Sequence, residues 1–249
     1  MTFTSKIKSL IQLIFRRFGF RIVPESRDAA NLVKQIEIFK ISTVIDVGAN
    51  RGDTVRKWRK MFPNAHIHAF EPLPAMQELL EVVQAEAPGY ITIWQLAASD
   101  SDGKATFQVH VDHPSSSSLF PRTALSAELF DFTQRQSEIV VRTAKLDGLI
   151  GPNSKTPVNG SVLIKLDVQG AELSVLRGAT EILAQTEFIV CEVNLADLYE
   201  GQSSLSSILN FFESREFRFC GFLEQFSTSD GVAVYADVLF RRKEVPLNG

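Results

Sequence analysis

Along this chain, short apolar runs alternate with segments in which apolar residues recur at helical spacing. The pattern predicts strands and helices in turn. Short apolar runs, typical of buried strands, occupy residues 43–47, 66–70, 90–97, 162–166 and 188–193. Segments with apolar residues at helical spacing adjoin them at residues 27–40, 53–62, 74–87, 171–184 and 203–215. In the helix expected over residues 74–87, the spacing directs Met76, Leu79, Leu80 and Val83 inward. This alternation predicts an α/β fold, with a parallel sheet and helices on both of its faces.

The alternation breaks after the polar turn at Asp100. Residues 105–111 and 138–143 look like strands, and between them residues 112–136 form a long irregular stretch that contains Ser115–Ser118. A long polar insertion between sheet elements is commonly a functional cover. Its place just after the third strand favours a lid or a substrate loop.

Two final apolar runs, residues 217–222 and 232–240, are joined by a polar turn over residues 227–231. Since no helix fits between these runs, we expect the two strands to pair antiparallel. The predicted sheet is therefore mostly parallel, with its last strand reversed.

The first twenty residues have a different pattern. Residues 3–20 are predicted to form an amphipathic helix, and the basic residues Lys6, Lys8, Arg16 and Arg17 precede any acidic residue. One interpretation is a helix packed on the domain or on a second subunit, which we favour because short basic helices are common at protein surfaces. The other is a helix lying on an anionic membrane surface.

Composition narrows the class of protein. The 249 residues are 45% hydrophobic, enough for one sizeable core, and the net charge of −3 gives no general case for nucleic-acid binding. Cys191 and Cys220 lie apart in apolar runs, as expected of buried thiols in a reducing compartment. Because no run has the length of a membrane span, and Arg16 and Arg17 interrupt the N-terminal apolar stretch, we expect neither a transmembrane helix nor a cleaved signal. These features predict a cytoplasmic protein.

The strongest chemical signal is the stretch VIDVGANRGD at residues 44–53. A buried strand carrying Asp46 runs into a turn with Gly48, Asn50 and Gly52, where glycine lets a ligand approach the backbone and the next helix offers free N–H groups. Glu71 follows the second strand, and a carboxylate there can accept both hydroxyls of a ribose. The plainer alternative is an ordinary glycine turn between a strand and a helix.

The spacing of that turn argues against a dinucleotide. A pyrophosphate cradle needs the pattern G-x-G-x-x-G, but Asn50 stands at the middle glycine position. A cofactor without phosphates fits better, and S-adenosylmethionine is the obvious candidate.

Several further blocks follow in order, and they carry a family resemblance. They are AFEP at 69–72, LAASD at 96–100, SSSSL at 115–119, LIKLDVQGAELSVLRGA at 163–179 and EVN at 192–194. With VIDVGANRGD, they resemble the FkbM family of S-adenosylmethionine-dependent methyltransferases over about residues 43–195. The resemblance implies a class I methyltransferase (Rossmann-like) sheet of seven strands. It also implies O-methylation, typically of a hydroxyl on a sugar, glycan or secondary metabolite.

The chain departs from the family pattern at two positions. Gln169 stands at the second acidic position of the usual D-x-E-G-x-E block, and Lys145 stands where a threonine is expected before Leu146 and Asp147. Gln169 leaves fewer carboxylates near the expected reaction centre, so we assign no metal ligand.

Ligands of open α/β sheets lie beyond the carboxyl ends of the strands. The position of each candidate residue near such an end therefore indicates its role. Cofactor contacts are expected from residues in the glycine turn, at the second strand end and after the third strand: Asp46, Gly48, Asn50, Gly52, Glu71, Ser99 and Asp100. Asp46 is expected to orient the turn by accepting its N–H groups or a water, and Ser99 or Asp100 to lie near the adenine amine. Glu172, in the first turn of a helix, has the simpler interpretation of a cap.

A hydroxyl acceptor benefits from a base. Asp167, at the end of the fourth strand, is the first candidate and Glu192 the second, and either His110 or His113 reaches the centre if residues 112–136 close as a lid. The alternatives are an N-cap role for Asp167 and a structural role for the histidines. Of the two histidines, His113 is the candidate catalytic residue.

Three functions remain open at this point. The first is an O-methyltransferase acting on a small molecule or glycan. The second is an N-methyltransferase, but the sequence after the fourth strand is DVQG and not the N/D-P-P-Y/F type that serves amines. The third is a cofactor-binding scaffold without catalysis. We expect residues 1–40 to be a helical segment, 41–243 the methyltransferase domain with an insertion at about 104–143, and 244–249 a tail.

Overall fold

The structure is a computed structural model that describes residues 17, 30–131, 134–154, 156–158 and 160–243. The helix expected over residues 3–20 and the tail at 244–249 lie outside the described residues, apart from Arg17. Among the described helices, none is both long and apolar enough to cross a membrane. Cys191 and Cys220 are both free thiols.

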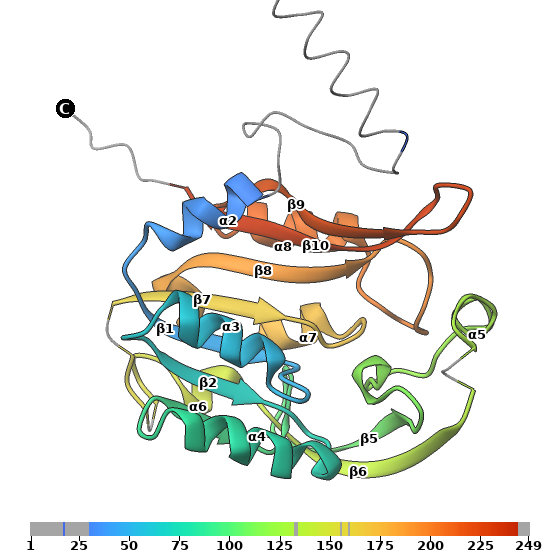
Figure 1. The fold of residues 1–249 in the computed structure, drawn as a ribbon, viewed down its shortest axis with the longest axis horizontal. Coiled ribbons are helices and arrows are strands. Elements are labelled where there is room, and N and C mark those ends of the chain that lie inside the picture. The colour runs from blue at the N-terminus through green and yellow to red at the C-terminus, as the bar shows by residue number, and fades with distance from the viewer. Residues whose placement is uncertain (1–16, 18–29, 132–133, 155, 159, 244–249) are drawn as a thin grey trace, which may run out of the picture.

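Within the described residues, seven strands form the main sheet (Figure 1). In sheet order they are β3 (Ile91–Trp94), β2 (His66–Phe70), β1 (Ile41–Val47), β7 (Ser161–Leu166), β8 (Thr186–Asn194), β10 (Ala233–Arg242) and β9 (Phe217–Ser227). Strand β10 runs antiparallel to both of its neighbours, and the pairs from β3 to β8 are parallel. The predicted mostly parallel sheet with a reversed last strand is therefore confirmed.

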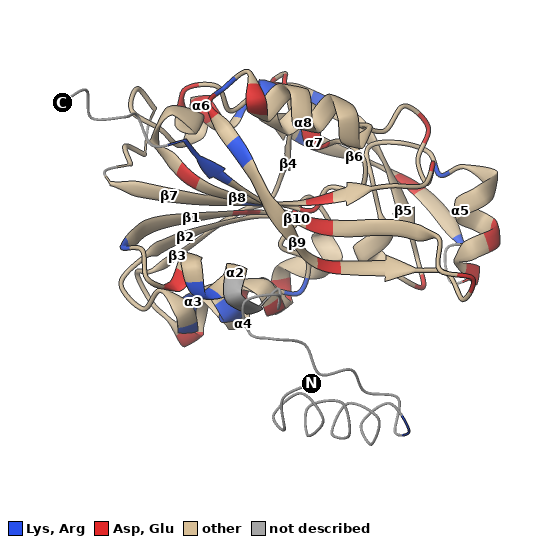
Figure 2. Ribbon diagram, turned by 90° about the horizontal axis from the view of Figure 1, so that it is seen from above, with Lys and Arg blue, Asp and Glu red and all other residues tan. Residues whose placement is uncertain are grey.

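Helices cover both faces of this sheet. Figure 2 shows α2 (Ala30–Glu37), α3 (Asp53–Met61) and α4 (Pro74–Glu86) on one face, and α6 (Leu146–Leu149), α7 (Glu172–Arg177) and α8 (Leu205–Glu213) on the other. Because side chains alternate along a strand, β1 supplies both cores: Val44 joins the cluster of Trp58, and Ile45 joins the cluster of Leu176. Both strand residues are fully buried, as a central parallel strand requires.

The insertion builds a second, smaller sheet beyond the carboxyl ends of the main strands (Figure 1). Its strands, in order, are β4 (Ala97–Ala98), β6 (Gln136–Ala144) and β5 (Gly103–His110). Phe107 and Val141 pack there against Leu73 and Met76 at the start of α4. The segment after β5, expected to be irregular, contains two short helices: η2 (Pro114–Ser116) and α5 (Ala124–Leu129).

Two details near β3 differ from the sequence prediction. The single strand expected over residues 90–97 is two strands, because the N–H of Leu96 donates to the carbonyl of Trp94 (2.9 Å) and turns the chain toward β6. In α4, Met76, Leu80 and Val83 are buried, but Leu79 is 42% exposed, so its predicted inward position is wrong. Adjacent helical residues differ by about 100° in direction, which places Leu79 on the border with solvent.

The helix expected over residues 171–184 is also two elements, α7 and the short helix η4 (Ile182–Gln185). At the break, a Cβ on Gly178 would lie 2.0 Å from the carbonyl oxygen of Ser99. The Asp147 carboxylate then accepts the N–H groups of Glu181 (2.9 Å) and Ile182 (3.0 Å) and starts the second element. Tertiary contacts, which periodicity does not reveal, therefore divide the helix.

Gly178→Ala should lower the free energy of unfolding by about 1–3 kcal/mol, the usual cost of overpacking. Gly148→Ala, in α6, is the matched control, because a Cβ there meets nothing within 4 Å. Alanine is preferred to glycine in a helix, so the control should keep or slightly raise stability. Urea unfolding followed by circular dichroism measures both variants, and equal stabilities would contradict the close contact at Gly178.

Candidate active site

The turn after β1 holds three strand ends together. The N–H groups of Gly48 and Ala49 donate to the carbonyl of Phe70 at 3.0 and 2.9 Å, and the N–H of Asp167 donates to Val47 (3.0 Å). Gly48 has a φ of 84°, and a Cβ there would lie 1.9 Å from the carbonyl oxygen of Asp167. Only glycine allows this approach, so the sequence at residue 48 fixes how closely β1, β2 and β7 meet.

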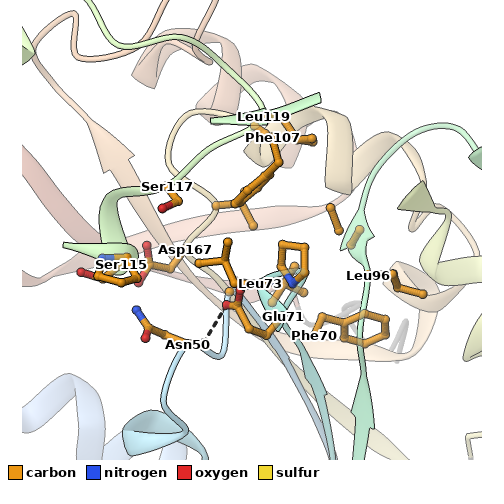
Figure 3. Close-up of a pocket in the computed structure, with 18 residues that line it drawn as sticks. Asn50, Phe70, Glu71, Leu73, Leu96, Phe107, Ser115, Ser117, Leu119 and Asp167 are labelled. Atoms are coloured by element: carbon orange, nitrogen blue, oxygen red, sulfur yellow. Dashed lines mark hydrogen bonds between the residues drawn. The ribbon is translucent and has the colours of Figure 1, made fainter. Parts of the chain in front are cut away.

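Glu71 is fixed at the end of β2 by backbone donors. Its Oε2 accepts the N–H of Asn50 (2.9 Å, dashed in Figure 3), and its Oε1 accepts the N–H of Leu73 (2.9 Å). Burial raises the pKa of Glu71 to about 7, although these two hydrogen bonds oppose the rise. The carboxylate is therefore rigid, and it faces a pocket.

That first pocket measures about 580 Å³, including its open mouth. Polar groups on one side come from Gly48, Asn50 and Glu71, and Asp167 closes one end. The remaining lining is largely apolar and includes Phe70, Leu73, Leu96, Phe107 and Leu119, as Figure 3 shows. An apolar slot with a few fixed polar groups and this volume is typical of a small-molecule site.

A second pocket of about 640 Å³ adjoins the first. Apart from Leu198, its lining consists of hydroxyl, carboxyl, amide and aromatic side chains, among them His113, Ser126, Phe130, Gln169, Glu192, Tyr199 and Tyr235. Ser115 and Asp167 line both pockets. Asp167 therefore stands where a molecule in one pocket meets a molecule in the other.

The Gln169 side chain links the carboxyl groups at this junction. Its Nε2 lies 2.7 Å from Asp167 Oδ1 and 2.6 Å from Glu192 Oε1, so its two hydrogens go to two different carboxyl groups. The other oxygen of Asp167, Oδ2, pairs with Lys165 Nζ at 2.7 Å. Gln169 has a φ of 56°, a conformation that few residues other than glycine adopt.

The serine run lies over this network and is bonded to it. The Tyr199 hydroxyl lies 2.8 Å from Gln169 Oε1 and 2.8 Å from the carbonyl oxygen of Ser116. The Ser118 hydroxyl donates to the backbone carbonyl of Gln169 (2.7 Å). Part of the segment expected to act as a cover is thus anchored to the residues that hold the carboxyl groups.

Charge at the site is concentrated around Lys165, which is 7% exposed. Burial alone lowers the pKa of Lys165, but Asp167 and Asp46 more than offset this and raise it above its ordinary value. Burial, with the nearby Asp167 and Asp237, raises the pKa of Glu192 well above 4.5. Burial also raises the pKa of Asp46 to about 6, and neither oxygen of Asp46 has a hydrogen-bond partner among the described residues.

The structure brings most of the candidate residues together. Gly48, Asn50, Glu71 and Asp167 line the first pocket, and Glu192 and His113 line the second. His113 is exposed at the pocket mouth, with Nδ1 2.8 Å from the hydroxyls of both Ser115 and Ser116.

Four of the other candidates, Asp46, Gly52, Ser99 and Asp100, line neither pocket, and their expected cofactor contacts stay predictions. The N–H groups of Gly48 and Ala49 donate to Phe70 and not to Asp46, which leaves a water as the expected partner of the Asp46 carboxyl group. Gly52 starts α3, where a Cβ would meet Val83 at 2.7 Å. The N–H of Ser99 pairs with Ala144 in the small sheet, so residues 96–98, and not Ser99 or the exposed Asp100, line the first pocket.

Two further residues considered above, His110 and Glu172, line neither pocket. His110 is 1% exposed. Glu172 accepts the N–H of Gly170 (2.9 Å), which precedes the N-cap residue Ala171, so this hydrogen bond fixes the turn before α7 and does not cap the helix.

Sequence reasoning missed three members of the network. Lys165 had a usable signal, because a charged residue within the apolar run of β7 needs a partner. Gln169 was noticed only as a departure from a family pattern, and its bridging role depends on a left-handed backbone conformation. Nothing in the local sequence distinguishes Tyr199.

Comparisons with known proteins agree with this geometry. The model of the FkbM methyltransferase domain matches residues 46–219. The chain is 30% identical over 185 residues to the 2-O-methyltransferase NoeI of Sinorhizobium fredii, covering 70% of this chain and 72% of NoeI. It is 27% identical over 130 residues to the hexuronic acid methyltransferase AglP of Haloferax volcanii, covering 52% of this chain and 48% of AglP.

Among solved structures, it is similar to magnesium protoporphyrin IX methyltransferase from Synechocystis PCC 6803. The TM-score is 0.46 at 13% identity, covering 86% of this chain and 76% of that one.

Asp46→Asn should change how stability depends on pH. An acid whose pKa is raised by folding binds its proton more tightly in the native state, so its contribution to stability falls as pH rises from its ordinary value of 3.8 through about 6. The full difference corresponds to about 3 kcal/mol, and asparagine cannot ionise. Between pH 4 and pH 7, urea unfolding without cofactor should shift in favour of the variant. Parallel pH curves for both proteins would contradict the buried, unpartnered carboxyl.

Proposed function

The chain belongs to the FkbM family of S-adenosylmethionine-dependent methyltransferases, and we propose that it transfers the methyl group to a hydroxyl of a sugar or glycan unit. The observation that carries this proposal is the position of Asp167 between two adjacent pockets. One pocket is apolar with fixed polar groups, and the other is lined with groups that bind hydroxyls. The 2-O-methyltransferase NoeI, at 30% identity, supports oxygen as the acceptor atom.

The first pocket fits S-adenosylmethionine. Asn50 lines it with a buried side-chain oxygen that has no partner among the described residues, and Glu71 faces it with both oxygens held by backbone donors. We assign the ribose hydroxyls to Glu71 and the methionine part to Gly48 and Asn50. The adenine is assigned to the apolar end, between Phe70, Leu96 and Phe107.

When bound, the cofactor supplies a methyl group on a positively charged sulfur. This chain's residues align the acceptor and take its proton. With the cofactor bound, the acceptor oxygen would take the methyl group from sulfur, and we assign the proton that leaves the hydroxyl to Glu192. Glu192 lines the acceptor pocket, and its Oε1 accepts a hydrogen bond from Gln169, so its carboxyl group is held beside the expected position of the hydroxyl. Asp167, held by Lys165 and Gln169, is assigned the orientation of the hydroxyl, and His113 a contact at the pocket mouth.

Nitrogen is the second candidate acceptor, and a cofactor-binding scaffold is the third. A hydroxyl needs a proton acceptor in the transition state, and two carboxyl groups line the second pocket. The segment after β7 reads DVQG and lacks the motif that serves amines. Both features favour oxygen and catalysis.

The same proposal covers the rest of the chain. We assign residues 41–243 to the methyltransferase domain, with the insertion at about 104–143 forming the acceptor side, and residues 1–40 and 244–249 to flanking segments. The free thiols support a reducing, cytoplasmic location. Residues 3–20, by their basic amphipathic pattern, are proposed to contact a second subunit or the inner membrane surface.

Glu71→Ala should weaken binding of S-adenosylhomocysteine about tenfold or more, the loss expected for charge-assisted hydrogen bonds. Gln77→Ala is the matched control, because Gln77 Nε2 donates to the backbone carbonyl of Glu71 (3.1 Å) and lies outside the pocket. Isothermal titration calorimetry measures both variants. Unchanged affinity in Glu71→Ala would contradict the assignment of Glu71 to the ribose hydroxyls.

The proposed reaction is tested with isotope-labelled S-adenosylmethionine and a panel of methyl pyranosides. The label is expected in a methyl ether, identified by mass spectrometry and NMR. In the same assay, Glu192→Gln should lower turnover by roughly 10²–10⁴-fold, the size of a general-base contribution. Its affinity for S-adenosylhomocysteine should stay near normal, because Glu192 does not line the first pocket.

The variants Asp167→Asn and His113→Gln are measured in the same turnover assay as Glu192→Gln. A large loss in Asp167→Asn with normal turnover in Glu192→Gln would return the base to Asp167. With a methyl 2-amino-2-deoxyglycoside added to the panel, label on its nitrogen and on no hydroxyl would replace the proposed acceptor atom. Cofactor binding without transfer to any acceptor in the panel would favour the scaffold.

A further inference from the structure

The second pocket carries acidic groups at its inner end. Asp167 and Glu192 line it there, and its described lining residues include no lysine or arginine. The nearby ammonium group of Lys165 is 2.7 Å from Asp167 Oδ2 and does not line the pocket. A ligand that reaches the junction with the first pocket therefore meets carboxyl groups.

The hydrogen-bond donors around these carboxyl groups are already in use. Gln169 gives one hydrogen to Asp167 and one to Glu192, and the Tyr199 hydroxyl has Gln169 Oε1 and a backbone carbonyl as its partners. Asp167 and Glu192 themselves line the pocket, and as carboxylates they present acceptor oxygens to it. The inner end thus offers acceptor atoms, which bind hydroxyl groups that donate.

A negatively charged ligand would be disfavoured at this place. Gln169 Nε2 lies 2.7 Å from Asp167 Oδ1 and 2.6 Å from Glu192 Oε1, so a ligand at this place meets two carboxyl groups side by side. A carboxylate on the ligand would donate no hydrogen bond at neutral pH and would add like-charge repulsion. Unpaired or repelled charge is a common way in which a site rejects a close analogue.

The outer wall of the pocket is aromatic. Tyr235 stacks on Phe226 with 5.2 Å between ring centroids and 13° between planes, and Phe130 lies 5.9 Å from Phe226. Tyr235 and Phe130 both line the pocket. Such a wall gives an apolar surface for the C–H face of a pyranose ring, while its hydroxyls reach the carboxyl groups.

We propose that the second pocket accepts an uncharged, hydroxyl-rich sugar unit and excludes uronic acids. This inference rests on the proposed sugar O-methylation and adds the charge class of the acceptor. It sets this chain apart from its relative AglP, which is a hexuronic acid methyltransferase.

The test uses three matched acceptors in each sugar series. They are the methyl glycoside, the methyl uronoside and the methyl uronamide of glucose, galactose and mannose. The uronamide has nearly the size and shape of the uronoside without its charge, so it separates charge from bulk. With labelled S-adenosylmethionine at pH 7.5, kcat/KM for the uronamide should exceed that for the uronoside at least tenfold in the series that reacts.

A variant in the pocket wall tests the same electrostatic cause. Tyr235→Arg places a cation beside the acceptor and should raise the ratio of uronoside to uronamide methylation at least fivefold. Tyr235→Phe, which keeps the stacked ring, should leave this ratio unchanged. Circular dichroism and S-adenosylhomocysteine affinity show whether each variant is folded.

The outcomes separate the two proposals. Equal rates for uronoside and uronamide, or a faster uronoside, would overturn the charge class and leave sugar methylation standing. Label in none of the sugars, with cofactor still bound, would reject sugar methylation, and the charge class would fall with it. A ratio that does not respond to Tyr235→Arg in a folded variant would also count against the inference.

Discussion

The Lys165 ammonium group allows several carboxyl groups to gather at the carboxyl ends of β1, β7 and β8. It is almost fully buried, and Asp167 lies 2.7 Å away, with Asp46 and Glu192 close enough to influence its charge. Removing charges from water costs several kcal/mol for each ion unless partners compensate. One cation shared among several acids offsets only part of this cost. The part that is not offset raises the pKa values of Asp46 and Glu192. The site therefore keeps several buried carboxyl groups that are costly to ionise, and such perturbed groups are typical of a functional site.

The backbone fixes where this charge lies relative to the two pockets. Gly48 lets β1 touch the carbonyl of Asp167, and hydrogen bonds from the same turn reach Phe70, directly before Glu71. Asp167 and Glu71, from strands on either side of β1, therefore face one pocket from fixed positions. The insertion closes the opposite side, since Ser116 and Ser118 bond to Tyr199 and Gln169. Rigid strands thus set the polar groups, and a loop bonded to them completes the lining.

Much of the fold could be predicted from the sequence, because local patterns determine it. The alternation of apolar runs with segments of helical spacing predicted the parallel sheet. The polar turn over residues 227–231, which leaves no room for a helix, predicted the reversed β10. The same strand-end rule located Glu71 and Asp167. What failed depends on contacts between distant segments: residue 178 must be glycine because the carbonyl of Ser99 lies against it, and Asp147 holds the N–H groups of the next short helix. Residues 96–98, and not Ser99 or Asp100, line the first pocket because the chain leaves the main sheet after Trp94, a departure that β-propensity does not encode.

Gln169 connects the family pattern with the chemistry of this particular chain. The usual glutamate at this position would add a third carboxyl group within about 3 Å of Asp167 and Glu192, and when ionised it could donate no hydrogen bond. The amide instead donates to both carboxyl groups and accepts from Tyr199, so each of its polar atoms has a partner. The neutral amide therefore lets Asp167 and Glu192 approach each other without further negative charge. Because these hydrogens serve the carboxyl groups, they are not available to a ligand, and the pocket is left with acceptor atoms that suit hydroxyl groups.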